Sequence, residues 1–193
     1  MNVFKKSIGL SIFFILTAGS VDAQHINQKK IDGKGNEMLL GPVDKNGLIS
    51  GTYSSWFNQQ YRSYDVDKII IKSIKNELRT YNLKVFMGTW CGDSKREAPR
   101  FYKLLEEANY PMAQLQLFAL DYEGDQYKKS PGGEEKGLNI IKVPTFIVYK
   151  NGKEVNRIVE EPVVSLEKDL YTIIRGGNYL PNYSTIPPVL PQD

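Results

Sequence analysis

Cysteine and histidine are almost absent from this sequence, which contains one of each among its 193 residues. A single sulfur, that of Cys91, excludes a disulfide within the chain, so the fold must be stable without one. The only histidine, His25, lies far from Cys91 in the sequence. We therefore expect neither cysteine–histidine catalysis nor a histidine-based metal site, and we predict no metal and no cofactor.

A long hydrophobic run is also missing. The longest apolar stretch, residues 8–16, is too short to span a membrane, which takes about 20 residues. It follows Lys5 and Lys6 and precedes a segment that ends at Ala23 and has small or compact side chains at the usual cleavage-site positions. This order is typical of a secretory signal. We predict a signal peptide at residues 1–23 and an exported protein, periplasmic or extracellular, with no stable membrane span after cleavage; an uncleaved N-terminal anchor is the alternative.

No strong excess of one charge is present. Removing Lys5, Lys6 and Asp22 with the signal reduces the 25 basic and 22 acidic residues to 23 and 21. Nucleic-acid binding would need a dense basic stripe, so we expect no nucleic-acid partner. Some 170 remaining residues are enough for one domain with a sizeable core.

The stretch around Cys91 joins a strand to a helix. Residues 83–87 have the length and apolar character of a buried strand, and the pattern of residues 93–109 predicts an amphipathic helix. The unpaired N–H groups of a helix N-terminus lower the pKa of a cysteine thiol below its usual value of about 8.5. The placement therefore favours a reactive sulfur over the inert, buried cysteine that is otherwise common.

Neighbouring side chains act on the same thiol in both directions. Lys95 and Arg96 favour the thiolate, Asp93 opposes it, and Ser94 is placed to donate a hydrogen bond to it. The sequence leaves the net effect open.

Periodicity predicts the other elements. Residues 24–48 are polar and read as a mobile arm with one short strand near residues 38–40, and the aromatic residues of 54–64 predict a helix packed on the core. The remaining predictions are a helix over 65–80 capped by Asp65, a strand over 114–121 parallel to 83–87, a short helix over 132–138, a hairpin of 145–149 with 154–159, and a last helix capped by Ser165.

The segment Trp90-Cys91-Gly92-Asp93-Ser94-Lys95 resembles the W-C-G-x-C-K active-site turn of the thioredoxin family. Three further features follow in the family's order: Pro99 within the helix, Val143-Pro144-Thr145 as a cis-proline loop, and residues 149–155 as the final hairpin. The resemblance covers residues 65–177, and four motifs in the correct order are far more specific than one.

This resemblance implies a thioredoxin-like α/β fold: a central mixed sheet of about four to five strands flanked by helices, with an N-terminal extension. It divides the chain into a signal peptide (1–23), an arm with an aromatic-rich extension (24–62), a thioredoxin-like domain (63–177) and a proline-rich tail (178–193). It also implies that Val143-Pro144 is cis, and that Trp90, Gly92, Val143, Pro144 and Thr145 shape a docking surface beside the sulfur.

Two departures from the family pattern concern one chemical step. Ser94 stands at the position of the family's second cysteine, and Val85 at that of its buried carboxylate. In the family, the second cysteine and the carboxylate both serve to resolve a mixed disulfide. Since this chain has neither at these positions, dithiol exchange within one chain is not expected.

The leading hypothesis is a thioredoxin-like monothiol protein. Its Cys91 forms a mixed disulfide that an external thiol resolves, and its partner is a protein or a low-molecular-weight thiol or disulfide. The alternative is a redox-inactive thioredoxin-fold module that docks a partner peptide in the cis-proline groove. A peroxide-reducing cysteine is a weaker third possibility, because the residue three before Cys91 is Gly88 rather than threonine.

Overall fold

A computed structural model describes residues 25–185. The predicted signal peptide and the last part of the predicted tail, residues 186–193, lie outside these residues. The strands are β1 (Gln28–Ile31), β2 (Glu37–Pro42), β3 (Asn82–Met87), β4 (Leu115–Ala119), β5 (Thr145–Lys150) and β6 (Lys153–Val159). The helices are α1 (Lys45–Leu48), α2 (Ser54–Ser63), α3 (Lys68–Leu78), α4 (Gly92–Glu107) and α5 (Leu166–Ile174), with 3-10 turns η1 (Gly51–Tyr53), η2 (Met112–Gln114) and η3 (Gly124–Gln126).

The strands form one mixed sheet in the order β1-β2-β4-β3-β5-β6. Strands β3 and β4 are parallel, with Val85 opposite Leu117, as the sequence predicts, and every other neighbouring pair is antiparallel. Helix α4 makes the crossover between β3 and β4. The thioredoxin fold class is thus confirmed, and the carboxyl end of β3, where open α/β sheets place their sites, delivers the chain to Cys91.

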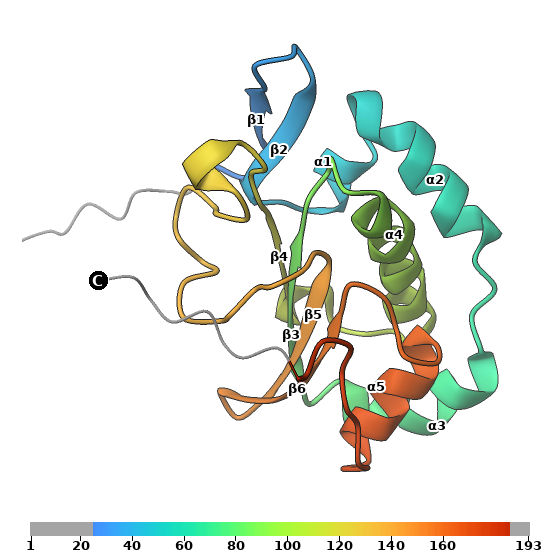
Figure 1. Cartoon of the computed structure of the whole chain (residues 1–193). Helices are drawn as coiled ribbons and strands as arrows, with labels where there is room; N and C mark the ends of the chain where they lie inside the picture. The colour runs from blue at the N-terminus through green and yellow to red at the C-terminus, as the bar shows by residue number, and fades with distance from the viewer. Residues whose placement is uncertain (1–24, 186–193) are drawn as a thin grey trace, which may run out of the picture.

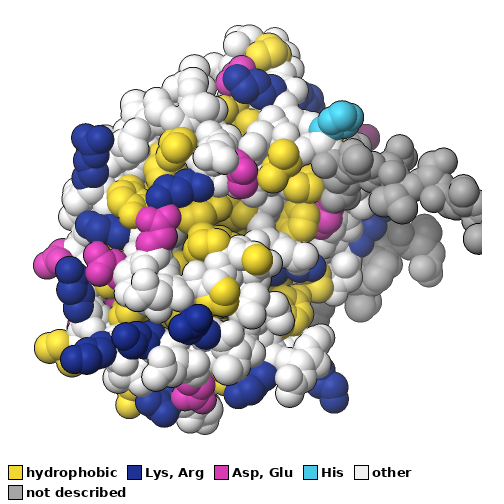
Figure 2. All heavy atoms as spheres, turned by 180° about the vertical axis from the view of Figure 1, so that it is seen from behind, with side chains coloured by type: hydrophobic (Ala, Val, Ile, Leu, Met, Phe, Trp, Pro, Cys, Tyr) yellow, Lys and Arg dark blue, Asp and Glu magenta, His cyan; other side chains and the backbone are white. Residues whose placement is uncertain are grey.

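The two faces of the sheet are covered differently. Helices α2, α3, α4 and α5 lie on one face (Figure 1), and their buried side chains form the main core with alternate residues of the strands. The long connection between β4 and β5 covers the other face, where a smaller cluster contains Phe86, Phe118 and Ile147. Seen from behind (Figure 2), hydrophobic side chains gather across the middle of the surface among scattered basic ones.

The predicted short helix over residues 132–138 is wrong, because this segment forms successive turns. Gly133 and Gly137 have positive φ values of 72° and 73°, a conformation that interrupts a right-handed helix and that glycine adopts readily.

The short strand predicted near residues 38–40 is present as part of β2, but the prediction of a mobile arm around it is wrong. Strands β1 and β2 form a hairpin, and Gly41 and Pro42 of β2 pair with Ala119 and Phe118 of β4, which extends the sheet to six strands. Met38 and Leu39 of β2 are 2% and 0% exposed. The hairpin was hard to predict because β1 carries polar side chains on both faces, so no alternation marks it as a strand.

Helix α2 confirms that the aromatic segment packs on the core. Phe57 is 1% exposed, and its ring centroid lies 5.8 Å from that of Tyr102 in α4. The N-terminal extension is therefore integrated with the helix that follows Cys91.

Local capping explains the ends of the other elements. Helix α3 begins at Lys68 and not near Asp65, because the side chain of Asp67 accepts hydrogen bonds from the N–H groups of Ile69 and Ile70 at 3.1 and 3.0 Å. Ser165 caps α5 as predicted, accepting from Lys168 N–H at 3.2 Å. Asn151 and Gly152 both have positive φ, 52° and 75°, as a type I′ hairpin turn requires.

Candidate functional site

Cys91 lies at the junction of β3 and α4. It is the N-cap residue of α4, with φ −85° and ψ 130°, so the chain is still extended at the sulfur and becomes helical at Gly92. Its N–H donates to the carbonyl oxygen of Gly88 at 3.0 Å, and its own carbonyl accepts the first bond of the helix from Lys95 at 3.0 Å. The sulfur is a free thiol and is partly exposed.

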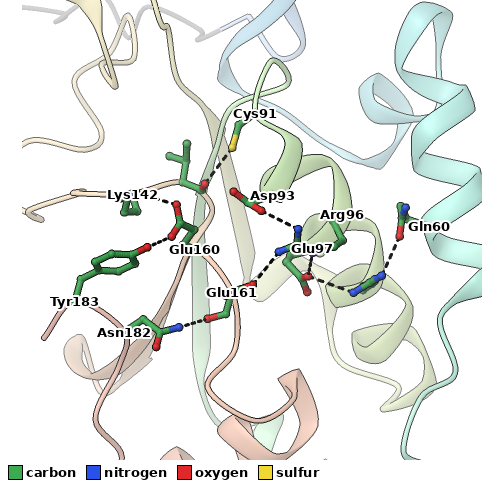
Figure 3. Close-up of polar contacts among 12 residues, drawn as sticks. Gln60, Cys91, Asp93, Arg96, Glu97, Lys142, Glu160, Glu161, Asn182 and Tyr183 are labelled. Carbon is green, nitrogen blue, oxygen red and sulfur yellow. Dashed lines mark hydrogen bonds and ion pairs between the residues drawn. The ribbon is translucent and has the colours of Figure 1, made fainter.

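The thiol faces the loop that contains Pro144. Cys91 Sγ donates a hydrogen bond to the carbonyl oxygen of Val143 at 3.2 Å (Figure 3), and the Val143–Pro144 peptide bond is cis. This contact exists only while the sulfur carries its proton. Glu160 N–H holds the loop by donating to Pro144 O at 2.7 Å, and Thr145 Oγ1 donates to Lys142 O at 2.6 Å. The structure therefore places Cys91 against the loop of Val143, Pro144 and Thr145, which begins 52 residues later in the sequence.

Ser94 has a partner different from the predicted one. Its side chain is fully buried, and its Oγ accepts a hydrogen bond from the backbone N–H of Gly88 at 3.1 Å. The expected hydrogen bond from the Ser94 hydroxyl to the sulfur is not among the contacts of the described residues, and the Cys91 thiol donates to Val143 O. The hydroxyl closes the turn around Cys91 from inside.

Trp90, the residue before Cys91, is held by contacts with the segment after β4. Its Nε1 donates to Leu120 O at 2.8 Å, and its ring centroid lies 5.5 Å from that of Tyr122. Gly88 makes this position possible, because a Cβ there would lie 2.5 Å from Cε2 of the indole. Sequence reasoning missed the roles of Gly88 and Tyr122, because the contacts of the Trp90 ring with the segment after β4 join residues about 30 apart in the sequence.

The charges beside Cys91 are mostly neutralised. Arg96 pairs with Asp93 at 2.7 Å, with Glu97 at 2.6 Å and with Glu161 at 3.2 Å (Figure 3). Burial lowers the pKa of Arg96, but its hydrogen bonds with these carboxylates outweigh burial and raise the pKa overall. Arg96 is therefore engaged chiefly by Glu97 and then by Asp93. Gly92 is exposed at the first position of the helix.

The start of the predicted tail folds back beside the proline loop. Lys142 Nζ lies 3.0 Å from Glu160 Oε1 and 4.9 Å from the ring centroid of Tyr183, whose hydroxyl also donates to Glu160. Burial raises the pKa of Glu160, yet the hydrogen bonds from Tyr183 and Lys142 together lower it. Asn182 adds a bond from its Nδ2 to Glu161 O at 3.0 Å.

The described residues offer little for a metal. Among residues 25–185, no group of three or more histidine, cysteine, aspartate or glutamate side chains is placed to hold an ion.

Val85, at the position of the family's buried carboxylate, is 1% exposed within the main core. None of the helices in the described part of the chain is long and apolar enough to cross a membrane.

Comparison with known proteins agrees with this geometry. The family model described as thioredoxin matches residues 70–172, more than half of the sequence, and the chain therefore belongs to the thioredoxin family. The match includes β3, α4, β4 and the β5–β6 hairpin, with Cys91 and Pro144, and excludes β1, β2 and α2.

Individual relatives match the chain at 35% identity or less, or over only part of its length. Thioredoxin-1 of Saccharomyces cerevisiae is 35% identical over 74 residues, which are 38% of this chain and 62% of that protein. Thioredoxin Asp f 29 of Aspergillus fumigatus is 29% identical over 109 residues, 54% of this chain and 92% of that protein. The chain thus spans less than two thirds of the length of Thioredoxin-1. The solved structure of Fasciola hepatica thioredoxin covers 55% of this chain, and the chain covers 89% of it, at 23% identity and a TM-score of 0.35.

Proposed function

We propose that this protein is a thioredoxin-like monothiol protein that takes part in thiol–disulfide exchange through Cys91. Its partner is a protein or a small disulfide, and a thiol from outside the chain completes the cycle. The observation that carries the proposal is the placement of a partly exposed Cys91 thiol at the start of α4, 3.2 Å from the carbonyl oxygen of Val143.

The exchange proceeds in two balanced steps. The Cys91 thiolate attacks one sulfur of a partner disulfide, a new S–S bond forms as the old one breaks, and the second partner sulfur leaves as a thiolate that takes up a proton. The thiolate of an external molecule then attacks the partner sulfur of the mixed disulfide. Cys91 is released in reduced form, and the partner ends in a disulfide with that external thiol.

The chain's own residues support the first step better than the second. An extended partner segment beside Pro144 would meet the Val143 carbonyl, which the sulfur leaves free once it has lost its proton or formed a mixed disulfide. Resolution inside the chain has no candidate, because Cys91 is the only cysteine and the hydroxyl of Ser94 cannot attack a disulfide. The mixed disulfide should therefore be long-lived.

Trapping tests the proposal. The wild-type protein is incubated with glutathione disulfide, excess reagent is removed, and the intact mass is followed with time. We expect one glutathione adduct on Cys91 that persists until dithiothreitol is added, and no adduct on a Cys91→Ala variant. An unmodified wild-type chain under conditions that fully modify a free cysteine in a model peptide would overturn the proposal.

A second candidate is the redox-inactive module that binds a peptide in the groove beside Pro144. Val85 favours it, because an apolar residue in the main core stands where the family keeps a carboxylate for disulfide chemistry. A Cys91→Ser variant separates the two: it should capture partners as well as the wild type under the second candidate and lose them under the first.

Export is part of the proposal as well. We infer that residues 1–23 direct the chain out of the cytoplasm of a bacterium, on the order of their basic, apolar and compact segments. N-terminal sequencing of the protein from the periplasmic or medium fraction should begin at Gln24.

A further inference from the structure

Each backbone carbonyl of residues 141–144, in the loop before β5, accepts a hydrogen bond. The donors are, in chain order of the carbonyls, Lys128 Nζ, Thr145 Oγ1, Cys91 Sγ and the N–H of Glu160. Three of these donors belong to the frame of the protein, and the other is the sulfur of the proposed exchange. The Val143 carbonyl, which faces that sulfur, is therefore the one that a reaction at Cys91 releases.

Glu160 holds this loop from the end of β6. It follows the last residue of that strand, and its N–H donates to Pro144 O at 2.7 Å. Its φ is 66°, a conformation that residues with a Cβ seldom adopt and that persists only where the surroundings hold it. Lys142 Nζ lies 3.0 Å from Oε1 of its carboxylate, and the Tyr183 hydroxyl donates to Oε2 (Figure 3). Each oxygen of the carboxylate thus has a donor from a different segment.

Tyr183 reaches the Lys142–Glu160 ion pair from the tail. Its ring centroid lies 4.9 Å from Lys142 Nζ, so one tyrosine contacts both the cation and the carboxylate. The two charged side chains are 40% and 19% exposed, and an ion pair that water reaches contributes little alone. A hydroxyl that donates to the carboxylate and a ring beside the cation both strengthen it. Lys142, Glu160 and Tyr183 together form a tail clamp, and its tyrosine lies outside residues 70–172, which match the family.

The neighbouring Glu161 joins the clamp to the helix that begins after Cys91. Arg96 of α4 has its NH2 group 3.2 Å from Glu161 Oε2, and Asn182 Nδ2 donates to Glu161 O at 3.0 Å (Figure 3). The two consecutive residues after β6 therefore connect the Pro144 loop, the start of α4 and the tail. The tail is fastened to both sides of the site.

We propose that the tail clamp positions the Val143 carbonyl to pair with the backbone of a polypeptide disulfide, so that Tyr183 is a positioning residue for substrates of this class. The inference rests on the proposed exchange function and adds a substrate preference to it. When the sulfur loses its proton, Val143 O loses its donor, and an extended partner chain supplies a backbone N–H in its place. The clamp keeps the carbonyl where that N–H meets it, which holds the partner's sulfur near Cys91.

Two uncharged reagents with the same leaving group separate positioning from thiol reactivity. Dithiodipyridine has no peptide backbone, whereas a short, end-blocked peptide of glycine, alanine and one cysteine carries the same pyridylthio group as a mixed disulfide. The Cys91 thiolate attacks one sulfur of the first reagent or the peptide sulfur of the second. A new S–S bond forms as the old one breaks, and the leaving thiolate takes up a proton to give pyridinethione. Its absorbance gives a second-order rate constant for each reagent with the full chain.

Tyr183→Phe removes only the hydroxyl that donates to Glu160 and keeps the ring beside Lys142. The variant should react with the peptide reagent roughly three- to tenfold more slowly than the wild type, which is the effect of one hydrogen bond. Its rate with dithiodipyridine should equal that of the wild type. A change in folding or in thiol reactivity would alter both rates, so the ratio of the two rates reports positioning.

A double-mutant cycle tests whether the tyrosine acts through Glu160. Glu160→Gly removes the carboxylate, keeps the N–H that bonds to Pro144 O, and suits the positive φ. It should slow the peptide reaction selectively, and adding Tyr183→Phe to it should cause no further loss, because both substitutions remove the same contact. The control Tyr171→Phe changes an exposed tyrosine of α5 and should leave both rates unchanged.

Three results would overturn the clamp and leave the exchange function standing: equal slowing of both reagents, an unchanged peptide rate in Tyr183→Phe, or additive losses in the double variant. A wild-type protein that releases pyridinethione from neither reagent would instead overturn the exchange function, and with it any positioning for that reaction.

Discussion

The hydroxyl oxygen of Ser94 accepts a hydrogen bond from the backbone N–H of Gly88 at 3.1 Å, which ties the first turn of α4 to the end of β3. Ser94 is fully buried, so water cannot replace it. The residue that stands in place of a second cysteine is thus part of the frame that positions Cys91.

Ser94→Ala should destabilise the protein. The substitution leaves the N–H of Gly88 buried and unpaired, which costs about 1–3 kcal/mol. Urea unfolding followed by circular dichroism measures the change in free energy. The control is Ser63→Ala, since the exposed Ser63 makes only a long 3.4 Å bond to Gln60 O; equal midpoints for the two variants would show that the Ser94 hydrogen bond contributes nothing.

Ser94→Cys should convert a stable adduct into a transient one. A sulfur three residues after Cys91 at a helix N-terminus can attack the mixed disulfide and expel the partner. We expect the lifetime of the glutathione adduct, measured by intact mass after removal of excess reagent, to fall by more than about tenfold. An adduct as persistent as that of the wild type would indicate that the buried position holds the new sulfur away from Cys91.

Much of the fold could be predicted from the sequence because its signals are local. Asn151-Gly152 marked the β5–β6 hairpin, Ser165 marked the start of α5, and the apolar run before Cys91 marked β3. Each of these depends on turn, cap or periodicity rules that need only a few neighbouring residues.

The rest depends on contacts between distant segments. The pairing of β2 with β4 joins residues more than 70 apart in the sequence, and β1 shows no alternation of polar and apolar side chains. The sequence therefore predicted a mobile arm where the structure has a hairpin. For the site, the sequence supplied the residues but not their partners: Ser94 bonds to Gly88 and not to the sulfur, and Arg96 is committed to carboxylates. The tail clamp was missed because its residues come from the loop before β5, the end of β6 and the tail.

Gly88→Ala should displace Trp90. A Cβ at position 88 would lie 2.5 Å from the indole, so the ring must move and lose its 2.8 Å hydrogen bond to Leu120 O. Overpacking of this kind costs about 1–3 kcal/mol. We expect a lower melting temperature and a shifted tryptophan emission.

Gly92→Ala is the matched control for this substitution. It adds the same methyl group four residues later, where nothing lies within 4 Å of the new Cβ, and alanine suits the first turn of a helix. This variant should be as stable as the wild type. An undisturbed emission spectrum in Gly88→Ala would contradict the proposed reason for a glycine at this position.

Asp121 should make the stability of the protein depend on pH in the acid range. Burial raises the pKa of its carboxyl group, but the hydrogen bonds from Lys30 Nζ and from the N–H groups of Glu123 and Tyr122 outweigh burial and lower it overall. A pKa lower in the folded state than the unfolded value of about 3.9 gives stability that is fully present above that value and is lost as the pH falls through the folded pKa.

The acid limb of the stability curve therefore tests this network. Asp121→Asn should be less stable than the wild type at pH 7 and should lose less stability between about pH 5 and pH 2, as measured by urea unfolding. Asp125→Asn, which removes an exposed carboxylate from the same loop, serves as the control for net charge. Parallel acid limbs in the wild type and Asp121→Asn would show that the pairing of Asp121 with Lys30, which fastens β1 to the end of β4, adds no stability of its own.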